Sequence, residues 1–336
     1  MKQSLFAVAA MSIFIAVCAS IGSAGATPPT IASTLPRTLT IGKKPSSAVH
    51  TAIALTSTYS RTDPRLEFFN ALNALRIAMG VGALRQDAAL DAAAENHLEY
   101  MKLNAVMSHT EILGNPGFTS PDPYQQVLTV GGSHRQWVGQ NAYSGELARC
   151  LASMANSVYH LQGITSNQET IGLAMHDNYC VANFGVVTAD GTGGYGLAQW
   201  GGQQLPPGTA AHYPADKGNV HGTFIPGDEI PNPAPDLARA GPPIMFRVNV
   251  EQPSDVLTVS NFILTGPGGS RVPARILVPA ESTAGSVASA IEDASLYRGV
   301  VFLLPTQPIA AGTYTATFAG ARNGAAINKS WSFTAY

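Results

Sequence analysis

The sequence predicts an α+β fold with two domains, a mixed helical and β domain followed by an all-β sandwich. Two observations predict it. Between residues 63 and 103 the apolar residues recur every three or four positions, which is the spacing of amphipathic helices. From Ile244 onward the apolar spacing changes to two, which is typical of half-buried strands. With 336 residues, the chain is long enough for two domains and flanking segments.

The first helix is predicted to follow an N-terminal tether. Residues 27–62 are rich in Thr, Ser, Pro and small apolar residues without periodicity, so we expect an extended segment there. Asp63 and Pro64 supply a helix start, an N-cap carboxylate before a proline at the first helical position. Gly80 and Gly82 end this helix. Its apolar stripe consists of Leu66, Phe69, Leu72, Leu75 and Met79.

Two further helices are predicted before residue 131. Asp87 caps a helix that runs to about Leu103, and His97 lies on or beside its buried face. We interpret His97 as a hydrogen-bonded packing residue rather than as a ligand. A short helix is expected at Tyr124–Val130, after a loop rich in Gly and Pro.

The next region combines a helix with strands. Glu146 to Tyr159 has apolar residues on one helical face, and His160 follows at the C-terminal end, where the helix dipole favours a protonated imidazole. Three strands are expected at residues 171–175, 181–188 and 195–200. The glycine-rich segment 190–194 predicts an antiparallel hairpin between the last two.

Residues 203–242 are rich in Pro, Gly and Asp, which predicts a linker. Short alternating segments separated by Pro-Gly, Gly-Gly and Asn-Gly turns then predict a β-sandwich over residues 243–336. Its strands are expected at residues 244–250, 257–263, 275–278, 300–304, 313–318 and 330–335. The turn before Tyr314 suits a tyrosine-corner contact. We expect residues 63–202 and 243–336 to have separate cores.

Residues 1–26 have the organisation of a secretory signal peptide. Lys2 is a short positive region, Leu5 to Val17 is an apolar segment too short for a comfortable membrane span, and Ala24-Gly25-Ala26 is a cleavage site. Lipidation at Cys18 and an uncleaved anchor are the alternatives. We therefore expect a secreted, periplasmic or cell-surface protein with no stable transmembrane span after cleavage.

Removal of the signal leaves two cysteines, Cys150 and Cys180. Exported chains with two thiols often pair them. A disulfide here closes a loop of about 30 residues and contributes about 3–4 kcal/mol in the chain-entropy model. The alternative is that both are small buried residues, one on a helix and one on a strand.

The order of short motifs between residues 63 and 202 resembles that of the CAP superfamily (cysteine-rich secretory, antigen 5 and pathogenesis-related 1 proteins, or SCP-like) in its bacterial form. The motifs are Leu72-Asn73-Ala74-Leu75-Arg76, Gly82-Ala83-Leu84, Ser108-His109-Thr110-Glu111, Trp137 to Gly145, Asn156 to His160 and Thr170-Ile171-Gly172. The resemblance implies an α-β-α sandwich. The segments Leu304-Pro305, Gly312-Thr313-Tyr314 and Trp331 to Thr334 resemble the end of a bacterial immunoglobulin-like domain.

The same resemblance implies a central cleft lined by two histidines and two acidic residues. His109 matches the first histidine and His160 the second, on either side of a Gly-Gln-Asn turn. Gln140 occupies the place of the family's glutamate, and Asn141 is a turn and cleft-wall residue. We find no convincing match for the second acid, since Glu111 and Glu169 are nearby in sequence but off the pattern. We expect the two imidazoles to face one cleft together with Gln140.

The glutamine changes the chemistry that this cleft supports. An amide orients an imidazole but accepts no proton, so Gln140 is not a general base and we assign no catalytic residue. His109 and His160 can hold a divalent metal such as Zn²⁺ if water or a third ligand completes the shell. The leading hypothesis is a non-enzymatic extracellular or envelope protein that binds a small ligand, a lipid or an envelope component. The alternatives are a metal-dependent hydrolase acting through His109 and His160, and a structural spacer.

Composition excludes one class of partner. Hydrophobic residues make up 45% of the chain and charged residues 12%, so both predicted domains can bury a core. The formal net charge is −2, and no basic segment gathers phosphate groups. We therefore expect no nucleic acid partner.

Overall fold

A computed structural model describes residues 56–187, 191–197 and 202–336, all within the compact unit Ser33–Tyr336. The predicted signal peptide, the alternatives at Cys18 and residues 27–55 of the predicted tether lie outside the described residues. The helices are α1 (Pro64–Met79), α2 (Ala88–Asn104), α3 (Pro123–Thr129), α4 (Cys150–Ala155), α5 (Tyr159–Ile164) and α6 (Ala280–Thr283). No helix of the described ranges is long and apolar enough to cross a membrane.

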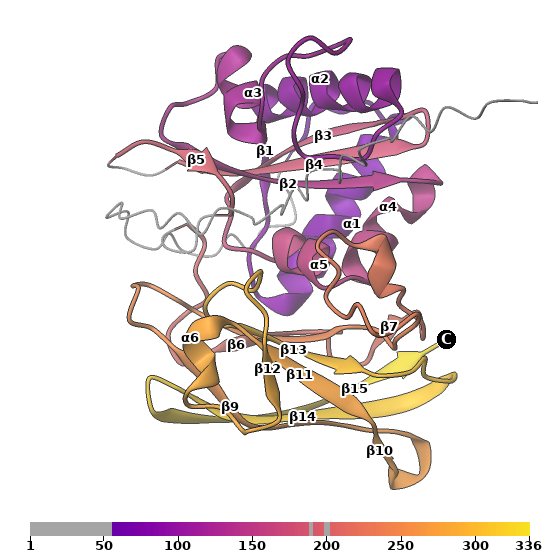
Figure 1. Cartoon of the computed structure of the whole chain (residues 1–336), viewed down its shortest axis with the longest axis vertical. Coiled ribbons are helices and arrows are strands. Elements are labelled where there is room, and N and C mark those ends of the chain that lie inside the picture. The colour runs from indigo at the N-terminus through magenta and orange to yellow at the C-terminus, as the bar shows by residue number, and fades with distance from the viewer. Residues whose placement is uncertain (1–55, 188–190, 198–201) are drawn as a thin grey trace, which may run out of the picture. The chain divides into compact units, whose positions relative to one another are not determined.

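The first sheet has five strands in the order β1-β3-β4-β2-β5. They are β1 (Arg85–Gln86), β2 (Gln136–Ser144), β3 (Thr170–His176), β4 (Tyr179–Val187) and β5 (Gly194–Tyr195). Helices α2 and α3 cover one face of this sheet, and α1, α4 and α5 lie on the other (Figure 1). This is the α-β-α sandwich that the resemblance implied.

The predicted boundaries of α1 and α2 are confirmed by their caps. The Asp63 carboxylate accepts a hydrogen bond from the backbone N–H of Arg65, and α1 ends at Gly80 in the left-handed region with φ 77°. The Asp87 carboxylate accepts bonds from the N–H groups of Ala89 and Leu90 at the start of α2. Local cap chemistry therefore determines where both helices begin.

The predicted hairpin between the second and third strands is wrong. β4 pairs antiparallel with β3, and β5 pairs parallel with β2. The turn between β3 and β4 consists of Asp177 and Asn178, with φ 50° and 64°. Two central residues in the left-handed region match the twist of a two-residue hairpin, so the turn forms there rather than at the later glycines.

The predicted helix from Glu146 to Tyr159 is also wrong, because it is broken. A 3-10 turn at Leu147–Arg149 leads into α4, and α5 begins only at Tyr159. At the break the Ser157 hydroxyl donates to the Met154 carbonyl, and the Asn156 amide donates to the Thr223 carbonyl. Short polar side chains that bond to nearby backbone compete with helix formation in this way.

The predicted disulfide is present. Cys150 at the start of α4 and Cys180 on β4 are bonded, with Cα atoms 6.5 Å apart. Both residues are fully buried. The bond therefore fastens α4 to the central sheet and closes the loop that contains His160.

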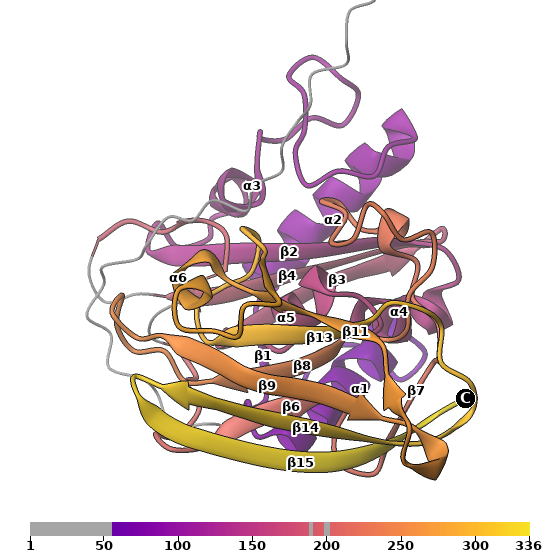
Figure 2. The same ribbon diagram turned by 60° about the horizontal axis from the view of Figure 1, so that its bottom comes forward.

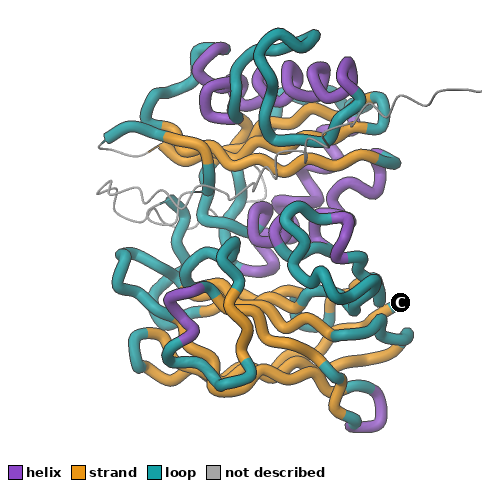
Figure 3. Tube along the Cα trace, viewed as in Figure 1, coloured by secondary structure: helices purple, strands orange, loops and turns teal. Residues whose placement is uncertain are grey.

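The C-terminal region is a β-sandwich of two five-stranded sheets, ordered β10-β9-β14-β15-β7 and β12-β11-β13-β8-β6. Figure 2 shows the two sheets face to face, and Figure 3 shows how little helix this region contains. Their strands are β6 (Ala210–Tyr213), β7 (Gly218–Val220), β8 (Ile244–Val248), β9 (Leu257–Thr265), β10 (Arg271–Val272), β11 (Ala274–Val278), β12 (Ala290–Glu292), β13 (Val300–Pro305), β14 (Gly312–Arg322) and β15 (Ala325–Ala335). The Tyr314 hydroxyl donates to the Ala310 carbonyl at 2.9 Å, which is the predicted tyrosine-corner contact.

The prediction of a linker over residues 203–242 is wrong, because this segment adds a strand to each sheet of the sandwich. β6 pairs with β8, and β7 pairs with β15. Composition misled the prediction, since Pro and Gly are common in linkers and also in the turns between short edge strands. One cluster of buried apolar residues includes Leu161 and Ile164 of α5 together with Met245 and Phe246 of β8. The expected separation into two cores is therefore not observed.

Candidate functional site

Gln140 and Asn141 lie in the middle of strand β2 and not in the turn that the sequence suggested. Adjacent residues of a strand point to opposite faces of the sheet. Gln140 is paired with Asn183, whose amide donates to the Leu90 carbonyl of α2. Asn141 points to the other face, where its amide donates to the His160 carbonyl of α5 at 3.0 Å. The side-chain amides of these two neighbouring residues therefore point toward different helical layers.

His109 is held by Gln140, as predicted. It lies in the loop between α2 and α3, and its Nδ1 is 2.9 Å from Oε1 of Gln140. The Gln140 amide nitrogen in turn donates to Oδ1 of Asn183 at 3.0 Å. Because that amide is used as the donor, its oxygen is the acceptor, and His109 carries its proton on Nδ1. The lone pair of Nε2 is then available to a ligand.

The loop that carries His109 is fixed by a buried His97–Glu111 pair. His97 lies on α2, with Nδ1 3.0 Å from Oε1 of Glu111 and Nε2 2.7 Å from the Ser108 carbonyl. Oε2 of Glu111 accepts from the backbone N–H groups of Thr119 and Ser120. Burial would raise the pKa of Glu111, but the bonds from His97 and Thr119 outweigh it and lower the pKa. The packing role predicted for His97 is confirmed, and Glu111 belongs to this support rather than to the cleft.

The pKa of His109 is lowered to about 4, chiefly by burial of the imidazole. The hydrogen bond with Gln140 opposes this effect, whereas the positive charges of His160 and His97 add to it. At neutral pH His109 is therefore uncharged and able to act as a ligand.

The lowered pKa predicts that His109 makes folding sensitive to acid. Above pH 6.5 this imidazole is neutral in both the folded and unfolded chains, so it costs no stability. As the pH falls toward 4 the unfolded chain binds a proton that the folded chain does not bind, and stability is lost. We expect His109→Gln to recover about 2 kcal/mol of this loss at pH 4, less than the full shift implies because His109 is not completely buried. Urea unfolding of wild type and His109→Gln between pH 4 and 7 measures this difference in stability.

His134 provides the matched control for this experiment, since it is an exposed histidine in the loop before β2. His134→Gln should leave the slope of stability against pH unchanged. Equal slopes for wild type and His109→Gln would show that His109 does not carry the effect.

His160 lies in the first turn of α5, not at the C-terminal end of a helix as predicted. The expected interaction with a negative helix end is therefore wrong, since the start of a helix is its positive end. The negative charge comes instead from Glu229, whose Oε1 is 3.2 Å from His160 Nδ1. Nδ1 also lies 3.1 Å from the Ser157 hydroxyl. Because Nδ1 is held by these two oxygens, Nε2 of His160 is its free nitrogen.

Glu229 is the contact of His160 that sequence reasoning missed. It follows the 3-10 turn η2 (Pro226–Asp228) in the segment predicted to be a linker, and it is 2% exposed. Its carboxylate accepts from the backbone N–H groups of Val158, Tyr159 and His160, at 2.9, 2.6 and 2.9 Å. A charge in a Pro- and Gly-rich segment gives no sign of such burial, so only the folded chain reveals this contact.

The predicted site residues thus form two groups, and the common cleft expected for the two imidazoles stays a prediction. Gln140 holds His109, and Asn141 and Glu229 hold His160 at its carbonyl and its Nδ1. Among the described residues, neither histidine belongs to a group of three His, Cys, Asp or Glu side chains whose ligand atoms all lie within 4.8 Å of one another. A metal held by His109 and His160 would therefore use their Nε2 atoms and take its other ligands from water.

Comparison with known proteins identifies the N-terminal region. Residues 69–188 match the family model of CAP, the cysteine-rich secretory protein family. A search of the curated proteins finds no match.

Three solved structures are similar to parts of the chain. An extracellular protein containing a SCP domain from Bacillus anthracis str. Ames has a TM-score of 0.32 and 17% identity, over 38% of this chain and 44% of that one, so the chain spans less than half its length. An outer surface protein of Borrelia burgdorferi has a TM-score of 0.33 and 20% identity, over 39% and 97%. A copper resistance protein of Escherichia coli has a TM-score of 0.22 and 15% identity, over 37% and 95%. The family match and the α-β-α sandwich agree that this chain carries a CAP domain.

Proposed function

We propose that this chain is an exported CAP-domain protein that binds a small ligand or a divalent ion through Nε2 of His109 and Nε2 of His160. The observation that carries the proposal is the orientation of the two imidazoles. Each has its Nδ1 engaged by a fixed oxygen, from Gln140 in one case and Glu229 in the other. Histidines that coordinate metals are commonly oriented in this way, by a partner on the second nitrogen.

The residues that contact the two histidines favour ligand binding over catalysis. Gln140 accepts no proton, and the Glu229 carboxylate is occupied by three backbone N–H groups. Ser157 touches His160, but its hydroxyl is buried and donates to the Met154 carbonyl, so it is not an accessible nucleophile. This arrangement suits recognition of a ligand by the two imidazoles, and we assign the chain to extracellular or envelope binding.

One observation favours the second candidate, a metal-dependent hydrolase. The sequence offered no acid to orient either histidine, whereas Glu229 lies against His160. A carboxylate behind an imidazole raises its basicity and fixes its orientation. Hydrolysis of model esters in the presence of Zn²⁺, abolished in His160→Gln, would favour this candidate over a binding role.

Zn²⁺ binding by the untagged protein tests the proposal. Calorimetric titration should detect an ion whose affinity falls at least about 10-fold in His109→Gln and in His160→Gln. His134→Gln is the control, since this histidine is exposed and outside the site. Zinc affinity that neither site variant changes would contradict the proposal.

A Gln140→Glu variant should strengthen the same site. A carboxylate 2.9 Å from His109 Nδ1 favours the charged imidazole, so the pKa of His109 should rise from about 4 and Zn²⁺ should bind more tightly. NMR titration of the histidines measures the first effect. Gln140 is only 4% exposed and donates to Asn183, so we also expect a stability loss of about 1–3 kcal/mol. An unmoved titration curve would mean that residue 140 does not control His109.

A further inference from the structure

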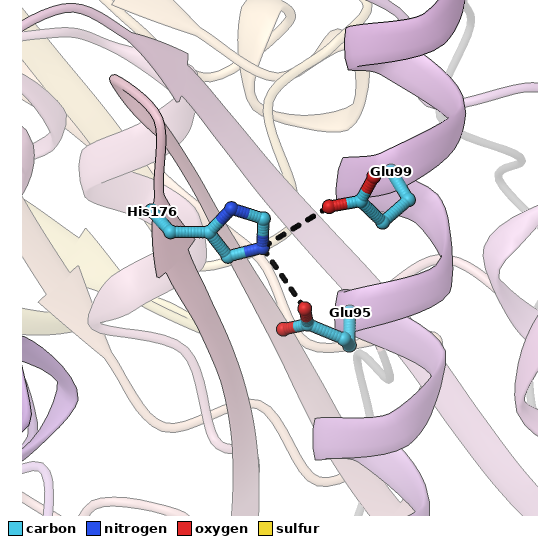
Figure 4. Close-up of side chains that lie close together, drawn as sticks. All are labelled: Glu95, Glu99 and His176. Carbon is cyan, nitrogen blue, oxygen red and sulfur yellow. Dashed lines mark hydrogen bonds and ion pairs between the residues drawn. The ribbon is translucent and has the colours of Figure 1, made fainter.

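A second group of metal-ligating side chains shares no residue with the proposed two-histidine site. Glu95 and Glu99 are four residues apart on α2, so they share one face of that helix. His176 is the last residue of β3. Figure 4 shows the three side chains pointing toward one another across the gap between helix and strand. Their ligand atoms all lie within 4.8 Å of one another.

We propose that Glu95, Glu99 and His176 form a binding site for a first-row divalent metal ion of the Zn²⁺ class. Nε2 of His176 is 2.9 Å from Oε1 of Glu95 and 3.6 Å from Oε1 of Glu99. Ligands of a tetrahedral zinc ion with bonds of about 2.1 Å lie about 3.4 Å from one another, so the two separations bracket the required spacing. Three protein ligands leave a fourth position for water.

Asp177 orients the histidine for this role. Its Oδ2 lies 3.0 Å from His176 Nδ1, on the side of the ring opposite the two glutamates. The same carboxylate oxygen accepts a hydrogen bond from the Lys102 ammonium at 2.6 Å, which fixes its position beside the ring. A proton on Nδ1 that is shared with Asp177 leaves the Nε2 lone pair directed at the glutamates. This is the carboxylate–histidine–metal arrangement found in zinc sites.

The charges of the group favour a cation. The carboxylates of Glu95, Glu99 and Asp177 contact the imidazole of His176, and the Lys102 ammonium contacts two of these carboxylates. The Lys102 ammonium is 2.8 Å from Oε1 of Glu99 and 2.6 Å from Oδ2 of Asp177. With the imidazole neutral, these five groups carry a net charge of −2, which a divalent ion neutralises. Lys102 competes with the ion for Glu99, so its removal should strengthen binding.

The donor set indicates which ion binds. Imidazole nitrogen with carboxylate oxygens suits Zn²⁺, whereas Ca²⁺ and Mg²⁺ prefer oxygen ligands alone. The side chains of Glu95, Glu99 and His176 are 47%, 40% and 32% exposed. An ion therefore reaches the site from solvent, and the side chains can close onto it by small rotations. The ion would tie α2 to the turn between β3 and β4.

Calorimetric titration of the untagged, chelator-treated protein with Zn²⁺ tests the proposal. The titration is performed in a His109→Gln/His160→Gln background, which removes both histidines of the proposed function and keeps this test separate from that one. One zinc ion should still bind. Adding His176→Gln or Glu95→Gln should weaken it at least about 10-fold, and Glu67→Gln, an exposed glutamate on α1, should not change it.

The second part of the experiment uses Lys102→Met, which should increase the affinity of the site for Zn²⁺. Zinc should therefore bind more tightly to Lys102→Met and more weakly to His176→Gln. Damage to the fold would not produce these opposite effects. Thermal unfolding of each metal-free variant verifies that the exposed substitutions leave the fold intact. Zinc affinity that is unchanged in both His176→Gln and Lys102→Met would overturn the proposal, as would displacement of the ion by millimolar Ca²⁺.

Discussion

Replacement of Glu229 by alanine is expected to lower the free energy of unfolding by about 3–5 kcal/mol. The carboxylate is buried and accepts from three backbone N–H groups at the start of α5. Without it those donors lose their partner, and each buried donor left unpaired costs about 1–3 kcal/mol. His160 also loses the oxygen that fixes its Nδ1. Urea denaturation at neutral pH measures the stability, and calorimetry with Zn²⁺ measures the effect on the proposed two-histidine site.

Asp228 offers a matched control because it is the exposed acid directly before Glu229. Asp228→Asn removes the same charge from the same segment, and should change stability by no more than about 0.5 kcal/mol. Glu229→Gln keeps one acceptor oxygen and should fall between wild type and Glu229→Ala. If Glu229→Ala were as stable as Asp228→Asn, the carboxylate would not hold α5 and its role at His160 would be refuted.

The elements that the sequence predicted well are those with local causes. Asp63 and Asp87 cap α1 and α2 because a carboxylate at the N-cap satisfies N–H groups two or three residues later. The sandwich strands follow from alternating apolar residues and from turns such as Asn323-Gly324 between β14 and β15. Such signals lie within a few residues of the structure that they determine, so they can be read without knowing the fold.

The features that were mispredicted depend on contacts between distant segments. Gly139, Gln140 and Asn141 favour turns by composition, yet pairing with β4 over the whole length of β2 keeps them in a strand. The break before α5 is stabilised by Glu229, which lies about 70 residues further along the chain. The motif order therefore predicted the contact between His109 and Gln140, but neither the acid beside His160 nor the faces of the sheet on which the two amides lie.

The contacts between the CAP region and the sandwich are as specific as those within either one. The Tyr159 hydroxyl donates to the Asp293 carboxylate at 2.9 Å. The Gln162 side chain donates to the Ser295 carbonyl and accepts from the Tyr297 N–H. Residues of α5 and β8 are members of one buried apolar cluster. A chain cut between these regions would therefore expose apolar surface and leave polar partners unsatisfied.

We accordingly expect a fragment that ends at Gly202 not to fold, although it contains the whole matched CAP segment. It lacks Glu229, which caps α5, and it lacks the strands that cover Leu161 and Ile164. The full chain should unfold in a single calorimetric transition, with equal calorimetric and van't Hoff enthalpies, because the shared core couples both regions. Circular dichroism of the fragment provides the second measurement. Two separate transitions in the full chain, or a fragment with native-like near-ultraviolet dichroism, would show that the CAP region folds independently of the sandwich.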